Sequence, residues 1–313
     1  MIDDRSGVCD TRGVSVAAIF AELSVTGAAY AAPIDGSGGG AGINEDDPMT
    51  PASVMKIQVA LAVESAIAAG TLEGARQCVL PAGRRTPGQV GISLLRDEVR
   101  MSVRDLVTQM LTVSDNPATD ELIGMVGLER INELTTGLGL TRTRITSDLM
   151  STLDGMAVDA GFPDYATQAG HDPAVAGPPF IDEVRQRLAR SAALDPTRGT
   201  RTTAADTVRL LRAIWTDTAA QPAACAAVRH AMAHQVTRRR IASGFGPAVT
   251  VAAKSGGLMG IVYNEAGVVT LPTGQQYAVA VFTRRAPGVP TDPAHIDAGI
   301  GRMARTLVDE LHR

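Results

Sequence analysis

The chain has 313 residues, of which 45% are hydrophobic and 20% charged, so it is long and apolar enough to bury a full-sized core. Its 29 basic and 33 acidic residues leave a formal net charge of −4, and only 3% of residues are aromatic. Such a chain lacks the basic surface and the stacking side chains that nucleic-acid binding requires. These numbers exclude a disordered chain and predict a globular protein that does not bind nucleic acid.

Hydrophobic periodicity predicts strands near both ends of the chain and helices between them. The predicted strands cover residues 14–23, 28–32, 249–255, 266–271 and 277–284. Pro272 to Gly274 form a turn between the last two strands, and residues 292–311 carry apolar residues on one face of a closing helix. Residues 51–69 are expected to form a buried helix, with Thr50 as its N-cap, Pro51 at its first position and Gly70 at its end.

Two lysines, Lys56 and Lys254, stand out because the other 27 basic residues are arginines. Codon bias alone would explain the arginines. A buried lysine, however, can lose its proton and act as a base, which an arginine cannot do. The residues around both lysines favour the chemical interpretation.

Lys56 follows Ser53 by three residues in the first turn of the predicted helix, so both side chains lie on one face. A serine becomes a good nucleophile when a neighbouring base takes its proton, and a desolvated lysine is such a base. The backbone N–H of Ser53, in the first turn, is free to stabilise an oxyanion. By itself Ser-x-x-Lys is common, and a first-turn serine is often only a cap.

Two further motifs follow along the chain. A helix that begins at Ser102, which forms a capping box with Asp105, ends in Ser114-Asp115-Asn116 before a proline. Lys254-Ser255-Gly256-Gly257 ends the strand that covers residues 249–255, and its glycines permit a ligand to approach the backbone closely. Taken singly, these motifs are also typical of a turn and of a strand end.

In this order, Ser-x-x-Lys, Ser-Asp-Asn and Lys-Ser-Gly resemble the signature of the penicillin-recognising serine enzymes, and the chain resembles the class A β-lactamases. The separation of Ser53 and Ser114 fits that family. The resemblance implies an α+β (mixed α/β) fold of two lobes. One lobe is a five-stranded antiparallel sheet with flanking helices, expected from residues 1–52 and 240–313, and the other is all-helical, expected from residues 53–239.

The resemblance also implies a role for each motif residue. Ser53 attacks a carbonyl to form an acyl-enzyme, with Lys56 as its base. Ser114 passes a proton to the leaving nitrogen, and Asn116 holds both Lys56 and a substrate amide. No metal and no organic cofactor are required by this chemistry.

The third motif is expected to bind the substrate. Lys254 and Ser255 bind a substrate carboxylate, Gly256 permits close approach, and the N–H of Gly257 completes the oxyanion hole with that of the nucleophile. The arginine that often assists carboxylate binding in the family is missing from its strand position, and Arg240 is a weak substitute before the strand.

One part of the family pattern is absent. Class A enzymes carry a glutamate that activates the deacylating water, and the nearest carboxylates here, Asp148 and Asp154, are out of register. An extended loop insertion is expected at about residues 147–200, and it forms either a lid over the site or a surface excursion. His171 in this segment is either a base or an ordinary exposed histidine.

The cysteines and the start of the chain suggest an intracellular protein. Cys9, Cys78 and Cys225 have neither disulfide nor zinc-ligand spacing, so we expect reduced thiols. The first residues are acidic, and no apolar run is long enough to span a bilayer. As the sequence stands, a cytoplasmic location without membrane attachment is expected; a trimmed chain would instead be extracellular or periplasmic.

We therefore expect a β-lactamase-type serine hydrolase that opens a β-lactam or related cyclic amide, slowly unless the inserted segment supplies a base. Two alternatives stay open. One is a cytoplasmic esterase, amidase or acyltransferase acting on a small carboxylate-bearing metabolite. The other is a covalent penicillin-binding sensor without turnover. The expected partner is a small molecule, and the expected oligomeric state is a monomer or a weak homo-oligomer.

Overall fold

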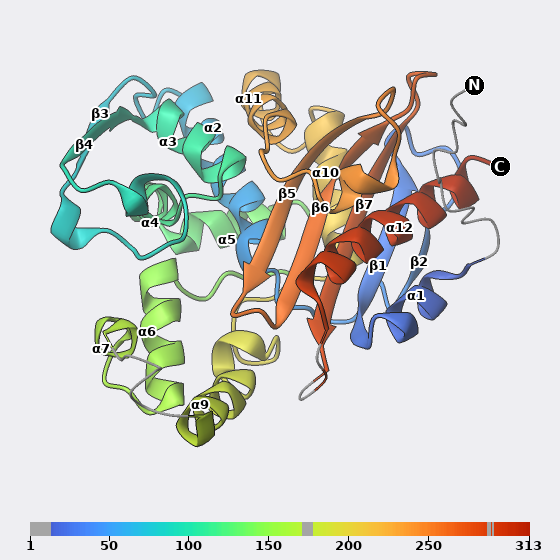
Figure 1. Cartoon of the computed structure of the whole chain (residues 1–313). Helices are drawn as coiled ribbons and strands as arrows, with labels where there is room; N and C mark the ends of the chain where they lie inside the picture. Colours follow the sequence, from blue (N-terminus) through green and yellow to red (C-terminus); the bar gives the residue numbers. More distant parts are fainter. Residues whose placement is uncertain (1–13, 171–177, 287–288, 290) are drawn as a thin grey trace, which may run out of the picture.

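A five-stranded antiparallel sheet forms one side of the molecule in the computed structural model, which describes residues 14–170, 178–286, 289 and 291–313 (Figure 1). Its strand order is β2-β1-β7-β6-β5. The strands are β1 (Val25–Pro33), β2 (Ala41–Ile43), β5 (Thr250–Leu258), β6 (Val262–Thr270) and β7 (Gln276–Arg285). The predicted α+β fold with a five-stranded antiparallel sheet is confirmed.

The central strand β7 is buried on both faces because its side chains alternate between two hydrophobic cores. Tyr277 and Val279 belong to the core under α1 (Val16–Glu22) and α12 (Pro293–Leu311). Ala278 and Phe282 belong to the core shared with the helices on the other face. In Figure 1, α12 crosses the front of the sheet and α10 (Ala204–Trp215) lies behind it.

The strand predicted over residues 14–23 is wrong, because α1 occupies this stretch. Ser15 caps the helix by accepting a hydrogen bond from the backbone N–H of Ala18 at 3.2 Å. Val16, Ile19 and Phe20 are buried at helical spacing against α12 and the sheet. In a stretch this short, the apolar residues fit both periods, and packing against α12 decides between them.

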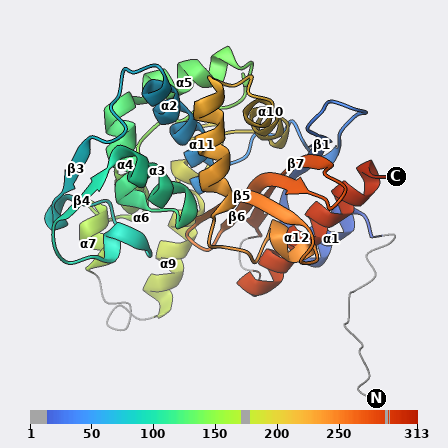
Figure 2. The same ribbon diagram turned by 90° about the horizontal axis from the view of Figure 1, so that it is seen from above.

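The helical part of the molecule lies beside strand β5, as both views show (Figures 1 and 2). At its centre lies α2 (Lys56–Ala68), which is buried almost all round, with Leu61 and Val63 completely inaccessible to solvent. The other elements of this part are β3 (Gln77–Leu80), η2 (Ala82–Arg84), η3 (Gly91–Leu94), β4 (Val99–Ser102), α3 (Val103–Thr112), α4 (Asn116–Val126), α5 (Leu128–Gly137) and α11 (Pro222–Ala233). A short 3-10 helix, η5 (Ile241–Gly244), precedes β5.

The segment expected as an extended loop at about residues 147–200 is largely helical where the structure describes it. It contains α6 (Leu149–Ala160), α7 (Tyr165–Ala169), α9 (Pro178–Ala189) and η4 (Ala192–Leu194). The expectation was wrong because the glycines and prolines that suggested a loop stand between these helices: Gly161, for example, ends α6 with a φ of 97°. His171 lies outside the described residues.

Both ends of this segment are anchored. Arg144 and Arg201 exchange two backbone hydrogen bonds of 2.9 Å, which close the segment at its base. Asp120 in α4 accepts hydrogen bonds from the N–H groups of Leu149 and Met150 and so holds the start of α6. These bonds fix the base of the segment and tie the start of α6 to the helical part of the molecule.

Two of the three cysteines can be placed. Cys78 and Cys225 are buried free thiols, and Cys9 lies outside the described residues. No helix of the described residues is long and apolar enough to cross a membrane.

Candidate active site

The predicted nucleophile, Ser53, lies in a short 3-10 helix, η1 (Ala52–Met55), that leads into α2. The prediction of an α-helical turn capped by Thr50 is wrong, since Pro51 stands at the cap position and makes no side-chain capping bond. Ala52 has a φ of 48°, an uncommon value for a residue with a side chain. As the second residue of η1, Ser53 presents a backbone N–H with no acceptor within the helix.

Asn264 in β6 explains this unusual turn, and it was not anticipated from the sequence. Its buried side-chain amide donates to the backbone oxygens of Thr50 at 2.9 Å and Pro51 at 3.1 Å. Its side-chain oxygen accepts a bond of 3.0 Å from the N–H of Thr283 in β7. The sheet therefore holds the chain just before the nucleophile in place.

Lys56 is completely buried, and its amine contacts the second motif. Nζ donates to the backbone oxygen of Ser114 at 2.7 Å, to Asn116 Oδ1 at 3.0 Å and to Ser114 Oγ at 3.3 Å. Burial lowers the pKa of Lys56 to about 7, against the opposing charges of Asp115 and Asp120. A large fraction of these amines is neutral at physiological pH, as a general base requires.

The second motif forms the sharp connection between α3 and α4. Ser114 has a φ of 66°, and strained non-glycine residues of this kind gather at functional sites. Asp115 is fully buried and accepts a bond of 2.8 Å from the N–H of Ala118, so it caps α4. Asn116 turns its side-chain oxygen to Lys56 and donates its NH₂ to the Pro87 oxygen at 2.7 Å.

Lys254, on β5, is also completely buried, and Nζ donates to the Ser255 oxygen at 2.8 Å. Burial is the main cause that lowers its pKa far below the usual value, and the charge of Lys56 lowers it further, while Glu265 opposes the change. The electrostatic effect of Lys56 on Lys254 indicates that the two lysines, far apart in sequence, lie near each other.

Gln235 and Glu265 position the lysine strand, and neither was anticipated from the sequence. The side-chain oxygen of Gln235 accepts a hydrogen bond from the N–H of Ser255. Its NH₂ donates to Glu265 Oε1 at 3.0 Å, and burial raises the pKa of this glutamate. A pattern of residue spacing could not reveal this network, because it joins the end of α11 to two strands.

The glycines of the third motif permit β5 to lie directly against the nucleophile turn. A Cβ atom on Gly256 would stand 2.6 Å from the Pro51 oxygen and 3.2 Å from the Ser53 nitrogen. Gly257 lines the same cavity as Ser53. The structure therefore brings together the three motifs that the sequence singled out.

Arg240 is engaged with the protein itself. Its Nε donates to Asp297 Oδ1 at 2.7 Å, and its Nη1 donates to the backbone oxygens of Gly256 at 2.7 Å and Asn264 at 2.6 Å. It is not among the described residues that line the cavity. These contacts hold β5 and β6, and its predicted part in carboxylate binding stays a prediction.

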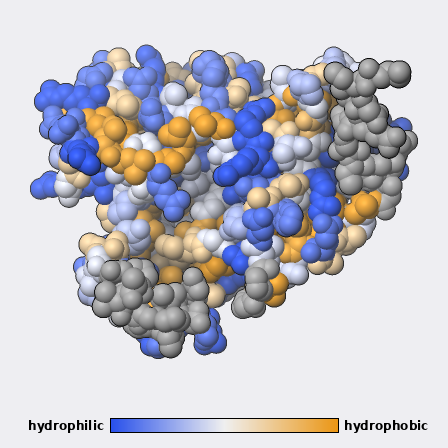
Figure 3. All heavy atoms as spheres, in the orientation of Figure 1, coloured by the Kyte–Doolittle hydropathy of each residue, from blue (hydrophilic) through white to orange (hydrophobic). Residues whose placement is uncertain are grey.

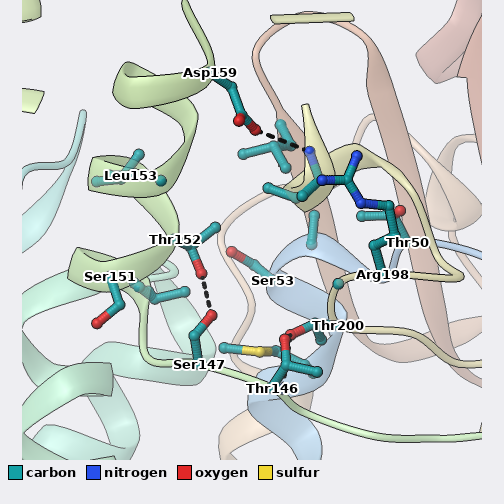
Figure 4. A pocket seen from close by; sticks show the side chains of 18 of the residues that line it. Thr50, Ser53, Thr146, Ser147, Ser151, Thr152, Leu153, Asp159, Arg198 and Thr200 are labelled. Carbon is teal, nitrogen blue, oxygen red and sulfur yellow. Dashed lines mark hydrogen bonds between the residues drawn. The ribbon is translucent and has the colours of Figure 1, made fainter. Parts of the chain in front are cut away.

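A cavity of about 470 Å³ opens beside Ser53 (Figure 4). Ser53, Asn116 and Gly257 line one side, and residues of α6 and of the stretch 198–200 line the other. Figure 4 shows the Ser53 hydroxyl pointing towards Ser147 and Thr152, which are hydrogen-bonded to each other at 2.9 Å. In Figure 3, the surface is hollowed between the helical part that contains α3 and α4, above, and the region of α6 and α9, below.

The cavity wall opposite Ser53 is made mainly of hydroxyl and apolar groups, with a single carboxylate among the described lining residues. Asp148 and Asp154 do not line it; Asp148 caps α6, and Asp154 accepts a bond of 3.0 Å from the N–H of Tyr165. Asp159 is the acidic residue among the described lining residues, and its Oδ2 accepts bonds from Ser191 Oγ and the Ala192 N–H. The described residues also contain no group of three ligands that could hold a metal ion.

Fold and site together define a scaffold of the serine hydrolase type, with a buried lysine three residues after the predicted nucleophile. The chain belongs to the β-lactamase enzyme family, whose sequence pattern matches residues 14–311. It is 29% identical over 283 residues to the β-lactamase regulatory protein BlaB of Streptomyces cacaoi, with 86% of this chain and 88% of that protein covered.

Solved structures show the same fold. A β-lactamase from Sphaerobacter thermophilus superimposes with a TM-score of 0.72 at 24% identity, covering 94% of this chain and 95% of that one. A point mutant of PBP-A, solved as an acyl-enzyme complex with penicillin G, gives a TM-score of 0.70 at 19% identity, covering 94% of each chain. The predicted class A β-lactamase-like family is therefore confirmed.

Proposed function

We propose that the protein is acylated on Ser53 by a β-lactam and that the ester formed is released slowly. The observation that carries the proposal is the buried amine of Lys56, with a pKa of about 7, one helical turn from Ser53 and hydrogen-bonded to Ser114 and Asn116. The Lys56 amine and the Ser114 hydroxyl belong to one hydrogen-bonded network, and half-buried Ser53 stands three residues before Lys56 in the chain.

The acylation step follows from these groups. The neutral Lys56 amine takes the proton as Ser53 Oγ bonds to the lactam carbonyl carbon. The negative oxygen is stabilised by the N–H groups of Ser53 and Gly257. The C–N bond then breaks, Ser114 donates its hydroxyl proton to the nitrogen, and Ser114 recovers a proton from the Lys56 ammonium. Lys254 and Ser255 bind the carboxylate on the part of the β-lactam that contains the leaving nitrogen.

Slow release follows from the opposite wall. Deacylation needs a positioned base for the attacking water, and the wall facing Ser53 offers Ser147, Thr152 and Leu149 rather than a carboxylate. Asp159 lines the cavity, but it stands at the opposite end of α6 from Leu149, where its Oδ2 accepts bonds from Ser191 and Ala192. A sensor that retains its adduct is the second candidate function. It is favoured by this wall and by the regulatory relative.

Mass spectrometry after incubation with benzylpenicillin tests the proposal. We expect an adduct with the mass of the intact penicillin, located on Ser53 and absent from Ser53→Ala. An unmodified wild-type protein, or an adduct that persists in Ser53→Ala, would refute it. The lifetime of the adduct separates the candidates: slow multiple turnover of a chromogenic cephalosporin indicates a hydrolase, and a permanent adduct indicates a sensor. Turnover of activated esters without β-lactam acylation would instead indicate an esterase.

A further inference from the structure

The cavity beside Ser53 contains a cationic side chain that pairs with no carboxylate. Arg198 and Asp159 are the charged residues among the described lining residues. Within the described part of the chain, the Arg198 side chain makes no ion pair and no hydrogen bond, and it is exposed. Asp195 is an acidic neighbour: hydrogen bonds from the Thr197 hydroxyl at 2.7 Å and the Thr197 N–H at 2.9 Å are the main cause that lowers its pKa, and the charge of Arg198 lowers it further without forming an ion pair.

The backbone that carries Arg198 is fixed, although its side chain is free. The N–H of Arg198 donates to the Asp195 oxygen at 3.0 Å, and the N–H of Gly199 donates to the same oxygen at 2.8 Å. Arg201 is tied to Arg144 three residues later. A guanidinium on a fixed turn presents its donors to the cavity with little loss of backbone entropy on binding.

The position of the cavity indicates which part of a substrate reaches Arg198. Ser114, the proposed donor to the leaving nitrogen, is not among the residues that line the cavity, and neither are Lys254 and Ser255. Ser53, Asn116 and Gly257 do line it. A carbonyl bound at Ser53 with its leaving group towards Ser114 therefore has its acyl substituent in this cavity.

We propose that Arg198 binds an anionic group, most simply a carboxylate, on the acyl side of the substrate. This inference rests on the proposed acylation of Ser53 and specifies its substrate class. It concerns a second carboxylate, distinct from the one assigned to Lys254 and Ser255. Asp159 also lines the cavity and would favour a cation instead (Figure 4). However, two hydrogen bonds tie Asp159 Oδ2 to Ser191 and Ala192, whereas the Arg198 guanidinium makes no hydrogen bond and no ion pair among the described residues.

Three penicillins with matched side chains test this assignment. Benzylpenicillin is neutral on the acyl side, carbenicillin adds a carboxylate there and ampicillin adds an amine. We would measure the second-order rate of Ser53 acylation by mass spectrometry for the wild type, Arg198→Gln, Arg198→Lys and Arg130→Gln. Arg130 is an exposed arginine of α5 that does not line the cavity, so its substitution removes the same charge elsewhere.

We expect the carbenicillin-to-benzylpenicillin rate ratio to be about tenfold higher in the wild type and Arg130→Gln than in Arg198→Gln, as for one charge-assisted contact. Arg198→Lys should keep part of the ratio. The preference should shrink near 1 M salt, where the screening length is roughly 3 Å, an effect that a merely structural role would not produce.

The other outcomes overturn the inference. A ratio that is equal in the wild type and Arg198→Gln removes Arg198 from substrate binding. Preferential acylation by ampicillin assigns the charge selectivity to Asp159. In both cases the proposed function survives, because Ser53 is acylated. If none of the three penicillins modifies Ser53, the proposed function fails, and this inference fails with it.

Discussion

Lys56 shows how one buried side chain can hold a chemical function. Its amine is buried away from solvent, and oxygen atoms of Ser114 and Asn116 accept its hydrogen bonds in place of water. Burial favours the neutral form, the charges of Asp115 and Asp120 favour the charged form, and the balance leaves the pKa at about 7. The amine can therefore both accept and return a proton near neutral pH.

The rate of acylation should depend on pH through this lysine. Only the neutral amine can take the Ser53 proton, so the benzylpenicillin acylation rate should rise with pH through about 7 and level off above it. Rapid-quench mass spectrometry at a series of pH values measures this profile. Lys56→Arg, which keeps the charge but cannot lose it, should be slower by about 10² to 10⁴. A flat profile, or an active Lys56→Arg, would contradict the role of Lys56 as base.

Individual residues were predictable where the chemistry requires a residue type in a fixed motif. Lys56 and Lys254 stood out as rare lysines, and the structure gives each a lowered pKa. Asn264 and Gln235 could not be found in this way. They act through strand pairing and through contacts between β6, α11 and the nucleophile turn, and such contacts leave no local spacing in the sequence.

At the scale of elements, β5 and η1 depend on each other. Gly256 is the point of closest approach, since the space for a side chain there is occupied by the backbone of Pro51 and Ser53. The geometry of the nucleophile therefore depends on a glycine in a different element. Buried cores tolerate such added atoms poorly when the obstacle is backbone rather than a flexible side chain.

Gly256→Ala should push η1 away from β5. We expect a loss of about 1–3 kcal/mol in the free energy of unfolding, as for an overpacked site, and acylation slower by at least about tenfold, since small displacements of reacting groups are costly. Gly246→Ala is the matched control, because a Cβ there meets nothing within 4 Å. Denaturant unfolding and acylation rates measure both effects. Equal behaviour of the two variants would show that the contact is not needed.

The elements themselves were predictable to different degrees. The strands β1, β5, β6 and β7 and the helix α12 lie close to their predicted positions, since each has a long buried face with a clear period. The short helix α1 and the helices of the 147–200 segment did not follow from local pattern. Packing against α12 makes residues 16–22 helical. In the 147–200 segment, glycines such as Gly161 were interpreted as loop residues, although they end helices.

For the whole molecule, the two buried lysines make the free energy of unfolding depend on pH. Burial lowers the pKa of Lys56 to about 7 in the folded state, against about 10.4 in an unfolded chain. Between these values the unfolded chain binds the proton that the folded protein releases. The free energy of unfolding must therefore rise with pH in this window, by at most about 1.4 kcal/mol per pH unit for one group.

This dependence can be isolated with Lys56→Met, which removes the titrating amine. Between pH of about 7 and about 9, wild-type stability should increase by about 1–3 kcal/mol relative to the variant, because groups common to both proteins largely cancel. Denaturant titrations at the two pH values measure the difference. Parallel stabilities of the two proteins would mean that Lys56 is not desolvated as described.

The anchoring of the 147–200 segment at Arg144 and Arg201 has an evolutionary consequence. The groups proposed for bond making come from η1, α2, the connection between α3 and α4, and β5, whereas the far wall of the cavity comes from this segment. Insertions or exchanges between the two anchor points would thus remodel the far wall of the cavity while leaving the turn that carries Ser53 undisturbed.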